Sequence, residues 1–301
     1  MQLYAARPDA EKAGMKLRSL LFVPGDSEHK LQKAVDSNAD VLILDLEDSV
    51  AASRKPIARG LVADYIRSQA KSHNAALYVR INPLDTPIAM VDLATICIPG
   101  LAGILLPKTL GFEDIIRLGY CLDALEAREG MDHETVKILP VATETPQAVL
   151  RMHSFSSTPR LSGVTWGAED LSTAIGAFSN RDEEGGDWSP LYVWAGSLCL
   201  AAAAAAQTQA IDTLHANFRD EAGLRSACRI SRRRGFRGRI AIHPDQVDVI
   251  NEAYSPSESE LLFARRIVEA FEANPDAGTL SIDGSMVDMP HLAQARRTLC
   301  L

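Results

Sequence analysis

Cysteine is sparse in this 301-residue chain, and none of its five cysteines stands in a Cys-x-x-Cys pair. An odd number of scattered cysteines indicates neither a disulfide framework nor a zinc knuckle, so we expect a reducing, cytoplasmic location. Long apolar runs are lacking too. The longest, over residues 194–206, is mostly alanine and falls short of the ~18 residues that cross a bilayer, so we expect no membrane partner.

Positive charge is also in deficit. The chain has 31 Lys plus Arg against 39 Asp plus Glu, which gives a formal net charge of -8. Such a surface repels phosphate backbones, so we expect no nucleic-acid partner. The sequence contains no Gly-x-x-x-x-Gly-Lys-Ser/Thr, Gly-x-Gly-x-x-Gly or Gly-x-Ser-x-Gly motif and no cluster of His and Cys. P-loop and Rossmann nucleotide chemistry and zinc chemistry therefore lack support.

What the chain does have is a regular alternation of short apolar runs with helical stretches. Hydrophobic residues make up 47% of the sequence, enough for a substantial core. The runs that read as strands are 18–23, 41–45, 77–81, 103–106, 136–141, 161–165, 210–214 and 239–242. The stretches that read as helices are 28–37, 56–72, 112–130, 191–209, 220–234 and 244–253. Eight alternating strands predict an α/β fold, a TIM (β/α)8 barrel with a C-terminal helical extension.

Three regions follow from this pattern. Residues 1–16 are a polar N-terminal extension, residues 17–255 the barrel and catalytic domain, and residues 256–301 the C-terminal helical extension. In the last region a turn at Asp283 and Gly284 precedes apolar Met286 and Val287, which indicates a docked structure with buried side chains. We expect this extension to reach a neighbouring subunit. The stretch 181–188 has no apolar period and two glycines, so it predicts a surface loop and a candidate lid.

Polar residues follow nearly every predicted strand. In a barrel these positions meet at the C-terminal face, where active sites lie. Capping of the next helix is the favoured interpretation for Asp26 and Asp212. Glu144 and Asp170 differ, because they follow neighbouring strands and their like charges repel each other unless a proton or a cation lies between them; we favour the cation. Mg²⁺ prefers oxygen ligands and keeps several waters, so two carboxylates and a chelating substrate suit it.

Arg80 ends the predicted strand at 77–81. It could form a rim ion pair, but a guanidinium inside a metal site would bind a carboxylate or polarise a carbonyl. We favour the functional interpretation.

Seven motifs in order resemble one family. They are Arg-Ser-Leu-Leu-Phe-Val-Pro-Gly (18–25), Val-Leu-Ile-Leu-Asp-Leu-Glu-Asp-Ser-Val (41–50), Tyr-Val-Arg-Ile-Asn (78–82), Gly-Ile-Leu-Leu-Pro-Lys (103–108), Thr-Glu-Thr-Pro (143–146), Gly-Ala-Glu-Asp-Leu (167–171) and Ala-Ile-His-Pro-Asp-Gln (241–246). From about Arg18 to its end, the chain resembles the citrate lyase beta-subunit-like group of the HpcH/HpaI aldolase/citrate lyase superfamily, which includes malyl-CoA and citramalyl-CoA lyases.

The resemblance implies a TIM barrel, usually a homotrimer, that uses Mg²⁺, or Mn²⁺ in its place, to cleave or form a carbon-carbon bond beside a CoA thioester. It also implies roles for individual residues. Glu144 and Asp170 match the metal ligands, with Glu144 also near the substrate, Arg80 matches a substrate-binding and catalytic arginine, and Asp288 matches an acid/base that some members supply from a neighbouring subunit. Asp45 and Glu47 would accept hydrogen bonds from the metal's waters, and Arg18 and Lys33 resemble positions that meet CoA.

The predicted function is a Mg²⁺-dependent lyase that cleaves citramalyl-CoA or malyl-CoA to acetyl-CoA and a 2-oxo acid, pyruvate or glyoxylate, by a retro-Claisen reaction. Three alternatives stay open. The chain could be a citrate lyase beta subunit acting on a thioester of an acyl-carrier protein. It could be a metal-dependent pyruvate aldolase that does not use CoA. It could also be a non-catalytic barrel that binds a CoA ester.

Overall fold

The structure is a computed structural model that describes residues 15–69, 75–183 and 186–300. The chain divides into two compact units. One is Leu17–Tyr254, and the other includes, within the described ranges, residues 15–16 and 255–300. Each unit has its own cluster of buried apolar side chains.

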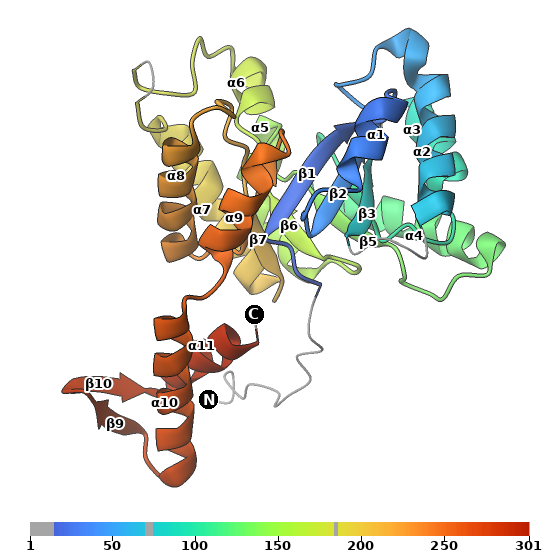
Figure 1. Cartoon of the computed structure of the whole chain (residues 1–301). Helices are drawn as coiled ribbons and strands as arrows, with labels where there is room; N and C mark the ends of the chain where they lie inside the picture. The colour runs from blue at the N-terminus through green and yellow to red at the C-terminus, as the bar shows by residue number, and fades with distance from the viewer. Residues whose placement is uncertain (1–14, 70–74, 184–185, 301) are drawn as a thin grey trace. The chain divides into compact units, whose positions relative to one another are not determined.

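The larger unit is built on eight parallel strands, as the sequence predicts (Figure 1). They are β1 (Ser19–Pro24), β2 (Val41–Asp45), β3 (Ala76–Arg80), β4 (Gly103–Leu106), β5 (Lys137–Pro140), β6 (Gly163–Thr165), β7 (Gln209–Asp212) and β8 (Gly238–Ala241). Their order in the sheet is β5-β4-β3-β2-β1-β8-β7-β6. Parallel bridges from Ile138 to Leu161 and from Val141 to Thr165 join the two ends of this order. The sheet thereby closes into a barrel.

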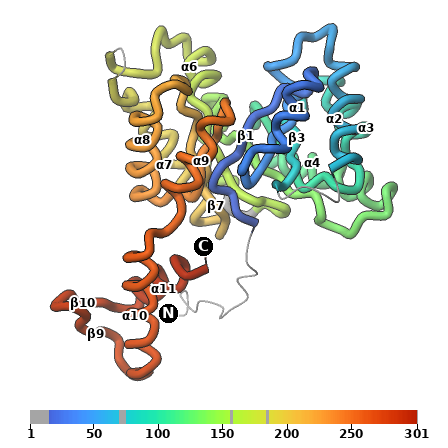
Figure 2. The backbone as a smooth tube through the Cα atoms, viewed as in Figure 1, coloured from blue at the N-terminus to red at the C-terminus, as the bar shows by residue number. Residues whose placement is uncertain are grey.

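Helices follow the strands along the chain, and Figure 2 traces this path. They are α1 (Glu28–Ala34), α2 (Lys55–Gln69), α3 (Pro87–Ile96), α4 (Phe112–Glu129), α5 (Pro146–Leu150), α6 (Glu169–Ile175), α7 (Pro190–Ala205), α8 (Glu221–Arg234) and α9 (Asp245–Tyr254), with short 3-10 turns at Ala52–Arg54 and Met152–Ser157. None of the helices in the described ranges is both long and apolar enough to cross a bilayer.

The pattern predicts six of these helices and misses α3, α5 and α6. Helix α3 is apolar on most sides, with Ile88 and Val91 exposed while Leu93 and Ile96 are buried. It therefore lacks the one-sided stripe by which a helix is recognised in a sequence. Helices α5 and α6 have five and seven residues, too few to show a period.

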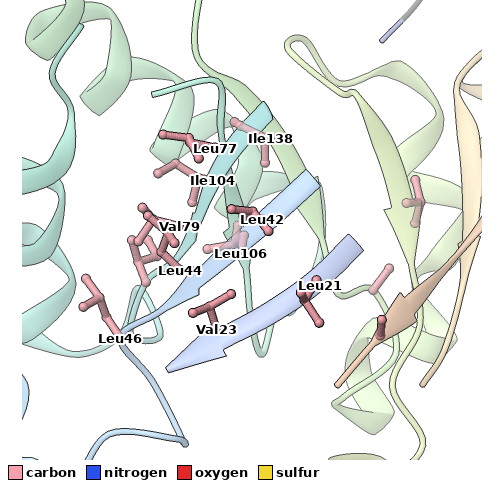
Figure 3. Packing of buried hydrophobic residues seen from close by; sticks show 14 of the residues in the cluster. Leu21, Val23, Leu42, Leu44, Leu46, Leu77, Val79, Ile104, Leu106 and Ile138 are labelled. Atoms are coloured by element: carbon pink, nitrogen blue, oxygen red, sulfur yellow. The ribbon is translucent and has the colours of Figure 1, made fainter. Parts of the chain in front are cut away.

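Alternation along the strands separates two cores. One set of side chains fills the barrel interior: Leu20, Val41, Ile43, Tyr78, Leu105, Leu139, Ile211 and Ile240. Their neighbours in sequence belong to the second core, under the helices, and Figure 3 shows Leu21, Val23, Leu42, Leu44, Leu77, Val79, Ile104 and Leu106 on the strand faces that the helices cover. Because the side-chain period of a strand is two, Asp45 follows Ile43 and Arg80 follows Tyr78 on the inward face.

The smaller unit contains α10 (Glu258–Ala273), strands β9 (Thr279–Ile282) and β10 (Ser285–Asp288), and α11 (Met289–Leu299). The two strands form an antiparallel hairpin that the sequence pattern did not predict. Asp283 and Gly284 make its turn, both with positive φ, as a two-residue hairpin loop requires. Val287 is 2% exposed, whereas Met286 is 68% exposed, so the expectation that both are buried is wrong. Consecutive strand residues face opposite sides, and only one of them reaches the core.

The barrel interior yields a test of packing. Gly103 on β4 lies against the buried Tyr78 ring, and a Cβ built there would lie 2.3 Å from a ring carbon. We expect Gly103→Ala to lower the free energy of unfolding by ~1–3 kcal/mol, because a closed barrel cannot move an aromatic ring aside. Urea unfolding checks this. Gly60→Ala is the control, since a Cβ there meets nothing within 4 Å on α2, and it should leave stability unchanged or raise it by up to ~1 kcal/mol. Equal midpoints for Gly103→Ala and the wild type would contradict the expectation.

Candidate active site at the C-terminal rim of the barrel

The centre of the site is an ion pair between the last residues of β2 and β3. Asp45 and Arg80 are register partners in the sheet, and Arg80 Nε and Nη2 donate to the two Asp45 oxygens at 2.6 Å each. Backbone N–H groups of Glu47 and Ser49 also donate to Asp45, which is 1% exposed. Burial alone would raise the pKa of Asp45, but these bonds, those from Arg80 above all, lower it. The guanidinium lies 4.7 Å from the centre of the Phe22 ring.

Glu47 links this pair to a second cation. Its Oε1 accepts from Lys108 Nζ at 2.5 Å, and its Oε2 lies 2.9 Å from Arg80 Nη1. Burial raises the pKa of Glu47, although both cations oppose the shift. Its Oε2 is buried and has no hydrogen bond of good geometry to any described residue. Such an oxygen could accept a hydrogen bond from a bound water or ligand.

Glu144 comes next, on the loop after β5. It is 6% exposed, and its Oε2 accepts from the backbone N–H of Lys108 at 2.5 Å. Burial above all, together with the charges of Asp170 and Glu47, raises the pKa of Glu144 to about 8, although the hydrogen bond from Lys108 opposes this shift. A Cβ at Gly167 would lie 3.1 Å from Glu144 Cγ. The glycine of the Gly-Ala-Glu-Asp-Leu motif therefore leaves the space that this side chain occupies.

Asp170 lies in the first turn of α6. It is more accessible than Glu144, with 37% of its side chain exposed. Its Oδ1 is 3.6 Å from Lys108 Nζ, which also lies 3.2 Å from Asp48. Glu144 and Asp170 therefore meet at one rim, where the sequence predicts them. We call the set Asp45, Glu47, Asp48, Arg80, Lys108, Glu144 and Asp170 the rim cluster.

The rim cluster has the composition that a hard divalent cation needs. Among the described residues its five carboxylates face two cations, Arg80 and Lys108. Burial above all, and then the charges of Asp170 and Glu47, raise the pKa of Glu144, and Glu47 Oε2 has no hydrogen bond of good geometry to a described residue. No group of three or more His, Cys, Asp or Glu side chains in the described ranges could hold a metal by itself. Glu144 and Asp170 suit Mg²⁺, which needs only one or two carboxylates if water and substrate complete its shell.

A buried network fixes the loop that carries Glu47. Asn82 Nδ2 donates to Asp92 Oδ2 and to the carbonyl of Leu46, and Lys55 Nζ donates to Asn82 Oδ1 and to the carbonyl of Glu47. The backbone at residues 46–47 is thus held from β3 and α2. Asn82 and Lys55 therefore fix the backbone that carries Glu47, while Lys108 and Arg80 contact its carboxylate.

The other predicted positions lie outside the rim cluster. Arg18 precedes β1, at the N-terminal end of the strands, and donates to Asp40 Oδ2 through Nε at 2.9 Å and to Oδ1 through Nη2 at 2.7 Å. Lys33 is exposed in the last turn of α1. The structure does not bring these two side chains together with the carboxylates, and their assignment to CoA stays a prediction.

Asp288 belongs to the smaller unit, where it caps the N-terminus of α11. Its Oδ1 accepts from the backbone N–H of His291 at 3.4 Å and lies 2.5 Å from His291 Nδ1. These bonds from His291 lower the pKa of Asp288. The capping role was not predicted.

Within the stretch 181–188, the two ends are anchored. Arg181 and Trp188 form an antiparallel bridge, and the guanidinium lies 3.5 Å from the centre of the Trp188 ring. Trp188 packs edge-on against Trp166 at 5.3 Å. Residues 184–185 lie outside the described residues, so the structure gives no support to the lid hypothesis and leaves it a prediction.

Sequence reasoning gave no individual role to Lys108 or Asn82. Their position after β4 and β3 was the available signal. The contacts that make them important reach 27 to 61 residues along the chain, and no local pattern encodes such contacts.

Comparison with known proteins agrees with this geometry. The family HpcH/HpaI aldolase/citrate lyase matches residues 18–244. A (3S)-malyl-CoA thioesterase of Cereibacter sphaeroides is 34% identical over 287 residues, covering 94% of this chain and 93% of the relative. The mitochondrial citramalyl-CoA lyase of Mus musculus is 30% identical, covering 94% and 85%.

A solved structure has the same fold. The crystal structure of the protein CitE from Mycobacterium tuberculosis in complex with magnesium, acetoacetate and coenzyme A superposes with a TM-score of 0.74. It is 31% identical and covers 94% of this chain and 96% of that one. The family match includes every strand of the barrel and the whole rim cluster. The chain therefore belongs to the HpcH/HpaI aldolase/citrate lyase family.

Proposed function

We propose that this protein is a Mg²⁺-dependent carbon-carbon lyase that cleaves a 3-hydroxyacyl-CoA thioester to acetyl-CoA and a 2-oxo acid. Citramalyl-CoA and malyl-CoA are the leading substrates, with pyruvate and glyoxylate as their products. The observation that carries the proposal is the convergence of Glu144, Asp170 and Arg80 at one rim of the barrel. Relatives that act on CoA esters and a neighbour that binds magnesium and coenzyme A support it.

Glu144 and Asp170 would hold the cation, with Mn²⁺ as the alternative to Mg²⁺. A bound divalent cation supplies Lewis acidity toward the substrate hydroxyl and carboxylate and a template that orients them. Asp45 and Glu47 would accept hydrogen bonds from waters on the cation, and Glu47 Oε2, which has no hydrogen bond of good geometry to a described residue, is the oxygen best suited to do so.

Arg80 is oriented by its carboxylate partners. Its Nε and Nη2 are bonded to Asp45 and its Nη1 lies 2.9 Å from Glu47 Oε2, which leaves further N–H groups on Nη1 and Nη2 for a ligand. The guanidinium stays charged, because Asp45 and Glu47 outweigh the effect of its burial and raise its pKa. An oriented cation of this kind stabilises negative charge that develops on the departing thioester enolate.

Asp288 is our proposed proton carrier. The cleavage requires the substrate hydroxyl to lose a proton and the thioester α carbon to gain one when the carbon-carbon bond breaks. In the smaller unit, His291 fixes Oδ1 of Asp288, and no hydrogen bond from the described residues is assigned to Oδ2. We propose that the segment 256–301 brings Asp288 to the rim of a neighbouring subunit in a homo-oligomer, a trimer by resemblance. The N-terminal extension 1–16 has no role in this proposal.

CoA would meet Arg18 and Lys33, as the resemblance implies, although Arg18 is already paired with Asp40. We also propose a cytoplasmic location, which the five free cysteines support.

A second candidate is hydrolysis of the thioester, because a 34% identical relative is named (3S)-malyl-CoA thioesterase. The same rim could direct a water to the thioester carbonyl. A citrate lyase beta subunit, a pyruvate aldolase independent of CoA and a non-catalytic CoA-ester-binding barrel are the remaining alternatives.

Product analysis tests the proposal. We expect purified protein with Mg²⁺ to convert malyl-CoA to acetyl-CoA and glyoxylate, or citramalyl-CoA to acetyl-CoA and pyruvate. Chromatography of the CoA esters and of the 2-oxo acid measures the products. Citryl-CoA, citryl carrier protein and the free hydroxy acids are the parallel substrates. Release of free CoA with malate would identify a thioesterase, and binding without turnover would identify a sensor.

Metal dependence is tested at the two ligands. Glu144→Gln and Asp170→Asn should each weaken Mg²⁺ binding at least ~10-fold and abolish turnover without lowering the thermal midpoint, since each removes one ligand charge at a rim position. Isothermal calorimetry and thermal unfolding measure both effects. Glu252→Gln is the matched control, because Glu252 is exposed and pairs with Arg225 on the surface. Metal titrations that match the wild type in both variants would rule out the assignment.

The role of Asp288 in a neighbouring subunit predicts complementation. Asp288→Asn and Glu144→Gln homo-oligomers should each be inactive, and oligomers reassembled from a mixture should recover part of the activity. Recovery would come from interfaces that join an intact metal site to an intact Asp288. Mass spectrometry of the intact assembly verifies mixing. Mixed oligomers without activity would mean that Asp288 acts in its own subunit or takes no part.

A further inference from the structure

Lys108, in the rim cluster, has an unusual backbone conformation. It follows β4 with φ of +49°, in the left-handed region that a residue with a Cβ seldom adopts. In this conformation its backbone N–H donates to Glu144 Oε2 at 2.5 Å. Its ammonium meanwhile lies among other members of the rim cluster. Backbone outliers of this kind persist where the surrounding structure fixes them, often at functional sites.

The ammonium contacts three carboxylates, two from the loop after β2 and one from the first turn of α6. Lys108 Nζ lies 2.5 Å from Glu47 Oε1, 3.2 Å from Asp48 Oδ2 and 3.6 Å from Asp170 Oδ1. These carboxylates outweigh the effect of burial and raise the pKa of Lys108, so the side chain carries its charge at any pH near neutrality. A fixed positive charge therefore contacts one of the two proposed metal ligands.

The two parts of Lys108 act on the metal ligands in opposite senses. The backbone N–H orients Glu144, which favours metal binding. The ammonium shares the negative charge of Asp170, and any cation between Asp170 and Glu144 must compete with it. We propose that Lys108 is a positioning residue that holds Glu144 through its backbone and sets a low affinity for the divalent cation through its side chain. This inference rests on the proposed function of the same site.

Glu47 decides how strongly the ammonium acts. Its Oε1 makes the shortest contact to Lys108, and its Oε2 lies beside Arg80. The negative charge of Glu47 thus offsets part of the Lys108 charge. Loss of Glu47 would both remove a negative charge from the rim and leave the ammonium more fully to Asp170. The two residues should therefore change metal affinity in opposite directions.

The experiment measures Mg²⁺ and Mn²⁺ affinity of the full chain by isothermal calorimetry, without substrate and at one low ionic strength. Lys108→Met removes the charge and retains the backbone N–H, and we expect it to bind either ion more tightly, on the order of tenfold. Glu47→Gln should bind more weakly by a similar factor. The double variant, which removes both charges, should have a metal affinity close to that of the wild type. Lys108→Arg, which retains the positive charge, should also keep the wild-type affinity.

Each result either supports or overturns the proposed role of Lys108. The inference is supported if Lys108→Met binds the ion more tightly and the double variant has the wild-type affinity. Unchanged or weaker binding by Lys108→Met overturns it. If the single lysine variant does not fold, Glu47→Gln and the double variant still decide, because equal affinities in these two would overturn it. A wild type that binds neither ion means that the metal dependence of the proposed function has failed. A wild type that binds, with no gain in Lys108→Met, means that only the inference has failed.

Discussion

The two-residue period of a strand in a closed barrel is the constraint on which the rest depends. It places Ile43 and Tyr78 in the interior and, two residues on, puts Asp45 and Arg80 above them at the C-terminal rim. Two buried, opposite charges at register-paired positions satisfy each other with two short hydrogen bonds. Breaking such a pair by removing one partner would leave an uncompensated buried charge, which is strongly destabilising. The ion pair thus lies at the base of the candidate site and also stabilises the fold.

Above this ion pair the rim cluster gathers five carboxylates against two cations among the described residues. Glu47 and Glu144 are buried, and both have a raised pKa because burial and neighbouring carboxylates oppose ionisation. The rigid support is correspondingly extensive, since Asn82 and Lys55 fix the Glu47 backbone while Lys108 holds Glu144. Groups held in place before a ligand arrives need no reorganisation when it binds, which is the usual basis of electrostatic stabilisation in enzymes.

The sequence predicts the barrel because its strands are apolar runs of regular spacing, and it predicts Glu144 and Asp170 because strand ends converge in such a fold. It does not predict that Lys108 contacts Glu47 and Glu144. A positive φ at a lysine and a contact between residues 61 positions apart have no local signature in a sequence. Arg18 shows the opposite limit, because its motif resembles the family while its guanidinium lies with Asp40 at the other end of β1. A motif specifies residue types more firmly than it specifies what each side chain touches.

The barrel contains a second Asp–Arg pair that shows how position in a strand separates function from support. Asp212 on β7 and Arg239 on β8 are also register partners and form a buried ion pair. They adjoin the inward residues Ile211 and Ile240 and so face outward, where Trp166 Nε1 donates to Asp212 at 2.8 Å. Asp212 therefore has a structural role, but the prediction that it caps the next helix is wrong, because Asp220 caps α8. The same two residue types thus lie beneath the rim cluster when they occupy inward positions of a strand, and form an ion pair beneath the helices when they occupy outward positions.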